Sequence, residues 1–142
     1  HSAKERIYEY HIVNRKSCLS LDKDTAWHVK KKIDLNLLRK GAKILEGKHD
    51  FSTFRASSCS AKSPIKKMNW IKIKKTGDKI FIKFSSKSFL QNQVRSMVGC
   101  LHYLATNKWS LNSFKDSFKS KKRAGCAPPA PACGLFLYNI KY

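Results

Sequence analysis

The segment from residue 65 to residue 86 constrains the fold more than any other part of the chain. It reads IKKMNWIKIKK, then Thr76-Gly77-Asp78, then KIFIKFSS. Both runs are rich in β-branched and aromatic residues and alternate apolar with polar positions, which is typical of strands with one buried face. The glycine between them supplies the backbone freedom of a tight turn. The segment therefore predicts a β-hairpin.

Other patterns extend this hairpin into a fold. Residues 5–13 and 135–142 alternate aromatic or β-branched residues with polar ones and predict two further strands. Three helices are predicted: one over 35–46, one over 88–105, and a shorter one after Ser110. Asp34 is the expected N-cap of the first helix, and Gly47 follows its C-terminus.

The remaining residues are expected to connect these elements. Residues 14–33 form a charged connection in which Trp27 and Val29 anchor locally, and Phe51–Arg55 is too short for more than a turn. The order of the elements predicts an α+β fold, a mostly antiparallel mixed sheet with helices packed on one face. With no internal repeat, residues 1–142 are expected to form a single domain.

The chain carries a large excess of positive charge. Thirty Lys and Arg residues stand against nine Asp and Glu, a net charge of +21. Such a surplus repels itself unless a polyanion neutralises it, so RNA or DNA is the predicted partner. Only six of the thirty are arginine, and a biased genome composition remains an alternative source of the lysines. A membrane surface is less favoured, because no basic amphipathic helix with exposed bulky apolar residues is evident.

The composition also limits the class of protein to which the chain can belong. At 142 residues and 42% hydrophobic content the chain can bury a real core. No apolar run is long enough to span a membrane, and the polar N-terminus has no signal-peptide pattern. The five cysteines include no C-x-x-C pair, which favours a reduced, cytosolic compartment. Cys126 and Cys133 could meet in a loop, although unpaired residues are the favoured interpretation.

The predicted long helix contains FLQNQVRSMVGCLHY, residues Phe89–Tyr103. Its apolar residues recur at three- and four-residue steps, which places them on one face; they are Leu90, Val94, Met97, Val98, Leu101 and Leu104. Arg95 falls on the opposite side, and Gly99, one turn later, is expected to leave space beside it. Taken alone, Arg95 would be a solvated surface residue.

Four blocks of the sequence, in order, carry a resemblance. They are HSAKERIYEYHI, EGKHDFSTFRASSCSAKSP, SFLQNQVRSMVG, and GLFLYNIKY after an Ala-Pro-rich loop. Together they span nearly the whole chain, and they resemble the C-terminal half of the TruA-type tRNA pseudouridine synthases. That family isomerises uridine to pseudouridine in the anticodon stem-loop of tRNA and uses no metal or organic cofactor.

The resemblance also implies that one catalytic group is missing. The family's nucleophilic aspartate belongs to an upstream Arg-x-Asp-(Ala/Gly)-Gly-Val-His segment, and this sequence contains no such segment. The resemblance places residue 1 just after the end of that segment. We therefore expect this polypeptide alone to be inactive.

By the same resemblance, three residues take roles at the site. Arg95 matches the arginine that pairs with the nucleophile, and guanidinium suits that role because it stays charged and grips a carboxylate with two hydrogen bonds. Tyr8 matches the active-site tyrosine that lies against the target base. Leu135 matches an apolar residue that lines the uracil pocket. Without the resemblance, Tyr8 reads as a half-buried strand aromatic and Leu135 carries no signal.

Further residues have two possible roles each. Arg55 and Lys62 are predicted to contact phosphates near the site, with ordinary surface charge as the alternative. His49 and Asp50 could form a general acid–base pair, but Asp50 capping the next turn is favoured. In the loop before the last strand, Lys122-Arg123 replaces the family's frequent Asp-Arg, which removes the acidic partner of any ion pair there.

The expected partners follow from charge and resemblance together. tRNA is the expected ligand, in the cytoplasm and without a membrane. A strand that opens near residue 1 would leave an exposed edge, so a second copy, forming a homodimer, or a missing N-terminal half is expected to cover it. The alternative function is a non-catalytic, strongly basic RNA-binding module, whose RNA affinity would be salt-sensitive and depend little on Arg95 or Tyr8.

Overall fold

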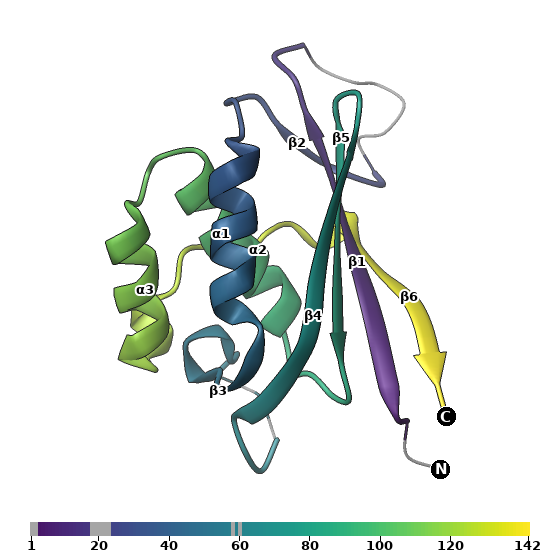
Figure 1. Cartoon of the computed structure of the whole chain (residues 1–142), viewed down its shortest axis with the longest axis vertical. Coiled ribbons are helices and arrows are strands. Elements are labelled where there is room, and N and C mark those ends of the chain that lie inside the picture. The colour runs from purple at the N-terminus through teal and green to yellow at the C-terminus, as the bar shows by residue number, and fades with distance from the viewer. Residues whose placement is uncertain (1–2, 18–23, 58, 60) are drawn as a thin grey trace.

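The computed structural model describes residues 3–17, 24–57, 59 and 61–142. Within these residues, six strands form one sheet and three α-helices cover one of its faces (Figure 1). This arrangement confirms the predicted α+β class with a mixed sheet. No helix among the described residues is long and apolar enough to cross a membrane.

The elements follow the predicted order with two additions. They are β1 (Glu5–Asn14), β2 (Trp27–Val29), α1 (Leu35–Leu45), β3 (Gly47–Asp50), β4 (Ile65–Thr76), β5 (Lys79–Ser86), α2 (Gln93–Ala105), α3 (Leu111–Ser120) and β6 (Leu135–Lys141). Short 3₁₀ turns lie at Ser52–Phe54, Arg123–Gly125 and Ala132–Gly134. The strand order is β2-β1-β5-β4-β3, and β6 also pairs with β1. In the described part of the chain, only the short β2 runs parallel to its neighbour, and the other pairings are antiparallel.

The predicted hairpin is β4 and β5. Thr76 pairs with Lys79 across the turn, and Gly77 takes the positive φ of 59° that the turn requires. Further along, Ile71 pairs with Phe84, so apolar side chains from both strands reach the same face. The predicted strand boundaries agree with the structure to within one residue.

The expectation of an exposed edge at β1 is wrong. β5 pairs with one side of β1, while β2 and β6 share the other side, so both edges of β1 are paired within the chain. Among the described residues β6 pairs only with β1, which leaves the outer edge of β6 open. Three of its large apolar side chains are exposed: Phe136, Leu137 and Tyr138. The sequence could not reveal which strands flank β1, because strand neighbours are set by pairing between segments far apart in the chain.

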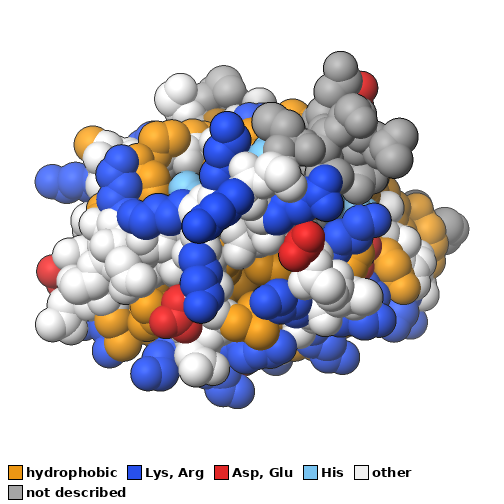
Figure 2. Space-filling model, turned by 90° about the horizontal axis from the view of Figure 1, so that it is seen from above, with side chains coloured by type: hydrophobic (Ala, Val, Ile, Leu, Met, Phe, Trp, Pro, Cys, Tyr) orange, Lys and Arg blue, Asp and Glu red, His pale blue; other side chains and the backbone are white. Residues whose placement is uncertain are grey.

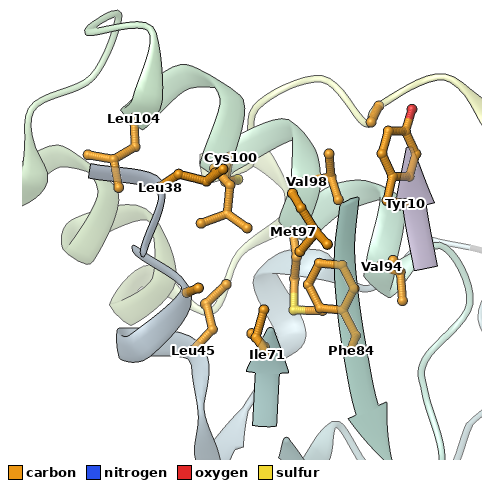
Figure 3. Close-up of a cluster of buried hydrophobic side chains, with 14 of the residues drawn as sticks. Tyr10, Leu38, Leu45, Ile71, Phe84, Val94, Met97, Val98, Cys100 and Leu104 are labelled. Carbon is orange, nitrogen blue, oxygen red and sulfur yellow. The ribbon is translucent and has the colours of Figure 1, made fainter. Parts of the chain in front are cut away.

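The core lies between the sheet and the helices. Figure 3 shows Phe84 of β5 lying beside Met97 of α2, and Tyr10 of β1 belongs to the same buried cluster. Leu38 and Leu45 extend the same cluster from α1. Fully burying each such side chain contributes about 1.5–3 kcal/mol, so α2 is held firmly against β1 and β5. That rigid contact positions the residues at the start of α2.

The helix N-termini confirm the predicted caps at Asp34 and Ser110 and correct the predicted start of α2. The side chain of Asp34 accepts from Leu37 N (3.1 Å), and Ser110 begins α3 in the same way. However, α2 begins at Gln93 rather than at residue 88. Asn92 takes a left-handed conformation (φ 63°), and the Gln93 side chain accepts from Leu90 N (2.8 Å). These two features hold residues 88–92 outside the helix, and residues 89–92 form part of a pocket wall.

Candidate active site

A hollow of about 210 Å³ lies where β1, the start of α2 and the start of β6 meet. Tyr8, Arg95 and Leu135, which the sequence places in three separate blocks, all line it. Its other lining residues are Phe89, Leu90, Gln91, Asn92, Gln93 and Val94. A larger hollow of about 400 Å³ lies on the sheet face that the helices leave uncovered, and none of the three predicted residues lines it.

Arg95 is oriented by the loop that precedes β6. Its Nε donates to the carbonyl oxygen of Ala130 (2.8 Å), and Ala130 N donates to the carbonyl oxygen of Arg95 (2.9 Å). This reciprocal pair fixes one edge of the guanidinium. A guanidinium carries five donor hydrogens, and within the described part of the chain no carboxylate forms an ion pair with Arg95. The terminal nitrogens of this pocket residue therefore remain for an acidic ligand or side chain.

Gly99 lets the same loop approach α2. A Cβ added at Gly99 would lie 2.1 Å from the carbonyl oxygen of Pro128, which is far inside van der Waals contact. The expected space beside Arg95 is therefore not empty: the backbone of the proline-rich loop fills it. Only glycine permits this distance, and with it the hydrogen bonds between Arg95 and Ala130.

Tyr10 holds the far end of the loop. It is fully buried, and its hydroxyl donates to the carbonyl oxygen of Pro131 (2.6 Å). Figure 3 shows this hydroxyl pointing away from the core towards the loop. Burial raises the pKa of the Tyr10 phenol, so the group stays a neutral donor. The guanidinium of Arg95 thus depends on a loop anchored on both sides, at α2 and at β1.

The opposite wall of the pocket is aromatic. The rings of Tyr8 and Phe89 meet edge to face with centroids 5.0 Å apart, and both are partly exposed. Sequence reasoning missed Phe89 and Asn92 as pocket residues because it placed them inside a helix. The available signal was the Gln91-Asn92-Gln93 run, three polar amides at the start of an otherwise apolar segment.

Arg55 and Lys62 do not line this pocket. Arg55 Nη2 donates to the carbonyl oxygen of Ala61 (2.5 Å), so it braces its own loop, while Lys62 is exposed. The loop still adjoins the pocket, because Ala56 N donates to the carbonyl oxygen of Gln91 (3.2 Å). That Arg55 and Lys62 contact phosphates stays a prediction.

His49 and Asp50 are occupied locally. Asp50 Oδ1 accepts from the backbone N (2.9 Å) and the hydroxyl (2.5 Å) of Ser52, which confirms the capping interpretation. Burial raises the pKa of Asp50, but the Ser52 hydrogen bonds and nearby cations outweigh it and lower that pKa overall. His49 Nε2 lies 2.7 Å from the carbonyl oxygen of Glu46. Neither side chain lines the Arg95 pocket.

Cationic side chains dominate the surface. Figure 2 shows Lys and Arg spread across one end of the molecule, with few acidic side chains among them. Among the described residues no group of three or more His, Cys, Asp or Glu side chains is arranged to hold a metal ion. The structure thus combines an arginine in a partly aromatic pocket with a cationic exterior.

Comparison with known proteins connects this geometry to a family. A family model described as tRNA pseudouridine synthase matches residues 42–142. The tRNA pseudouridine synthase A of Pelagibacter ubique is 61% identical over 142 residues, covering 100% of this chain and 58% of that protein. The proteins of the same name from Xanthobacter autotrophicus and Azorhizobium caulinodans are 43% and 45% identical over 141 residues, 99% of this chain and 58% and 55% of theirs. The chain thus spans little more than half the length of these relatives.

Proposed function

This chain belongs to the tRNA pseudouridine synthase family, and we propose that residues 1–142 form the C-terminal half of a TruA-type enzyme. That enzyme isomerises uridine to pseudouridine in the anticodon stem-loop of tRNA. The observation that carries the proposal is the pocket shared by Tyr8, Arg95 and Leu135. Three blocks that match the family in sequence supply one residue each to a single site.

Arg95 pairs with the nucleophilic aspartate, which comes from the family's upstream segment. An adjacent guanidinium favours the ionised carboxylate and keeps the pKa of that carboxyl group low. The bond from Nε to Ala130 fixes the guanidinium plane, so that its terminal nitrogens can hold the carboxylate in one orientation. This chain by itself supplies no nucleophile and is inactive.

The pocket also retains the uracil between its detachment and its reattachment. Tyr8 provides an aromatic face and Leu135 an apolar one, which together suit a flat, uncharged ring. The target nucleotide must first leave its stack at a cost of a few kcal/mol. The surface charge of the chain offsets that cost by binding the surrounding phosphates, with Arg55 and Lys62 among the proposed contacts.

The test compares two arginines in the longer polypeptide that includes the upstream segment. Arg95→Ala should reduce turnover by several orders of magnitude and change tRNA affinity little. Arg39→Ala is the matched control, because exposed Arg39 also donates to one backbone carbonyl, that of Ile73 (3.1 Å), but lies outside the pocket. Turnover is measured as tritium released from the uracil carbon that becomes bonded to ribose, and affinity by filter binding.

Two results would refute the proposal. Equal losses of turnover and affinity in Arg95→Ala would point instead to a non-catalytic RNA-binding module. Pseudouridine formed by the isolated 142-residue chain would show that the nucleophile lies within it. Sedimentation of the longer polypeptide tests the homodimer that the family leads us to expect.

A further inference from the structure

Two cysteines face each other between α2 and the proline-rich loop. The Sγ atoms of Cys100 and Cys126 are 3.6 Å apart. Cys100 is buried, and Ala127 N donates to its Sγ (3.4 Å), which fixes the side chain. Cys126 is partly exposed. Cys133, which the sequence offered as a partner for Cys126, instead lies against the carbonyl oxygen of Ala26.

The surroundings of Cys126 favour its thiolate. Arg123 Nη1 lies 4.0 Å from the Cys126 Sγ and is held there by a bond to the Ser96 hydroxyl (2.7 Å). The hydrogen bond from Cys100 and the charge of Arg123 lower the pKa of the Cys126 thiol despite its burial. Hydrogen bonding to Cys126 and burial raise the pKa of the Cys100 thiol. Cys126 is partly exposed and lies beside Arg123, which makes it the candidate nucleophile, and the buried Cys100 next to it is the candidate resolving thiol.

We propose that Cys100 and Cys126 are an oxidisable pair that forms a disulfide in the folded chain when it meets a peroxide. The Cys126 thiolate attacks one oxygen of the peroxide, which breaks the O–O bond and leaves a sulfenic acid and a hydroxide. The Cys100 sulfur then attacks the Cys126 sulfur, the S–O bond breaks, and hydroxide leaves with the Cys100 proton as water. Two thiols are oxidised, and hydrogen peroxide is reduced to two waters.

The geometry makes this step a local one. Because a disulfide is about 2.05 Å long, the two sulfurs need to approach by only about 1.5 Å. The bond would tie Cys100 of α2 to the loop that carries Ala130, the residue that orients Arg95. Oxidation therefore adds a covalent link to a contact that is otherwise made by hydrogen bonds and by the close approach at Gly99.

The experiment isolates the pair in the 142-residue chain. The variant C18S/C59S/C133S keeps only Cys100 and Cys126. After treatment with hydrogen peroxide and alkylation of free thiols, we expect both thiols to be lost, one cross-linked peptide, and a higher thermal midpoint. A thiol reductant should reverse all three. With Cys126→Ser, Cys100 should remain a free thiol; with Cys100→Ser, a sulfenic acid should be trapped on Cys126.

Three outcomes would overturn the proposal. The first is a Cys100 that is still alkylated after Cys126 has been fully oxidised. The second is a cross-link that forms equally fast in urea, since the folded geometry would then be irrelevant. The third is a wild-type chain in which Cys59 or Cys133 is oxidised before Cys126 and no cross-link between Cys100 and Cys126 appears.

Discussion

Replacing Gly99 with alanine sets two physical effects against each other. Alanine is favoured over glycine inside a helix by about 0.8–1.0 kcal/mol, so helix propensity alone predicts a more stable protein. The structure predicts the opposite, because the new Cβ would lie 2.1 Å from the Pro128 carbonyl oxygen. That oxygen belongs to the backbone and cannot rotate away. The loop must move as a whole.

The magnitude follows from what that movement breaks. Overpacking costs about 1–3 kcal/mol, and the bonds exchanged by Arg95 and Ala130 are worth about 0.5–3 kcal/mol each. After the propensity gain is subtracted, these terms span about 1–8 kcal/mol, and we expect Gly99→Ala to lose about 2–4 kcal/mol because a shift of the loop need not break both bonds completely. For a chain of this size the thermal midpoint should fall by about 10 °C.

Urea unfolding followed by circular dichroism gives the free energy of unfolding. The matched control is Gly41→Ala in α1, where the new Cβ would lie 2.6 Å from Leu104 Cδ2 and 2.8 Å from Leu101 Cδ2. Those atoms are the ends of flexible side chains, so the control should lose clearly less. A Gly99→Ala protein as stable as the wild type would refute the argument and with it the account of how Arg95 is oriented.

Three further substitutions test other parts of the structure. Tyr10→Phe removes the bond to Pro131 and should cost about 1 kcal/mol in urea unfolding, with faster solvent exchange of the Arg95 Nε proton by NMR; unchanged exchange would contradict the loop's role. Asp34→Ala removes the cap on Leu37 N and should cost about 1 kcal/mol of unfolding free energy; no loss would contradict it. Burial and two nearby lysines lower the pKa of His102 below 6.5. The neutral side chain therefore contributes fully to the free energy of unfolding above that pH, and the contribution is lost as the pH falls through the folded-state pKa. His102→Gln should therefore reduce the fall of the thermal midpoint with decreasing pH, and an unchanged dependence of the midpoint on pH would exclude His102 as its source.

Local signals predicted the fold well where structure is decided locally. The hairpin around Gly77 and the caps at Asp34 and Ser110 appear as expected, because each depends on residues only a few positions apart. The start of α2 was misplaced because helical periodicity continues through Leu90, while the left-handed Asn92 interrupts the backbone. The short strands β2 and β3 gave no signal of their own, since three or four residues become a strand only beside a partner.

The site was predicted in the same uneven way. Tyr8, Arg95 and Leu135 were found by family resemblance, and the structure brings them to one pocket. The role of Gly99 could not be found, because the Pro128 carbonyl that fills its space comes from a distant part of the chain. The anchoring of that loop by Tyr10 was likewise a product of tertiary structure.

The central place of β1 has a consequence for how the chain folds. Glu5 at its start is paired with Lys141, 136 positions later (141 − 5), and the two strands lie side by side in Figure 1. Closing so long a loop costs chain entropy before the contact repays it, and such high contact order slows folding. During synthesis, residues 5–10 of β1 must wait for nearly the whole of this sequence to leave the ribosome before β6 covers their second edge. Until then their unsatisfied amide and carbonyl groups are available to any extended peptide nearby.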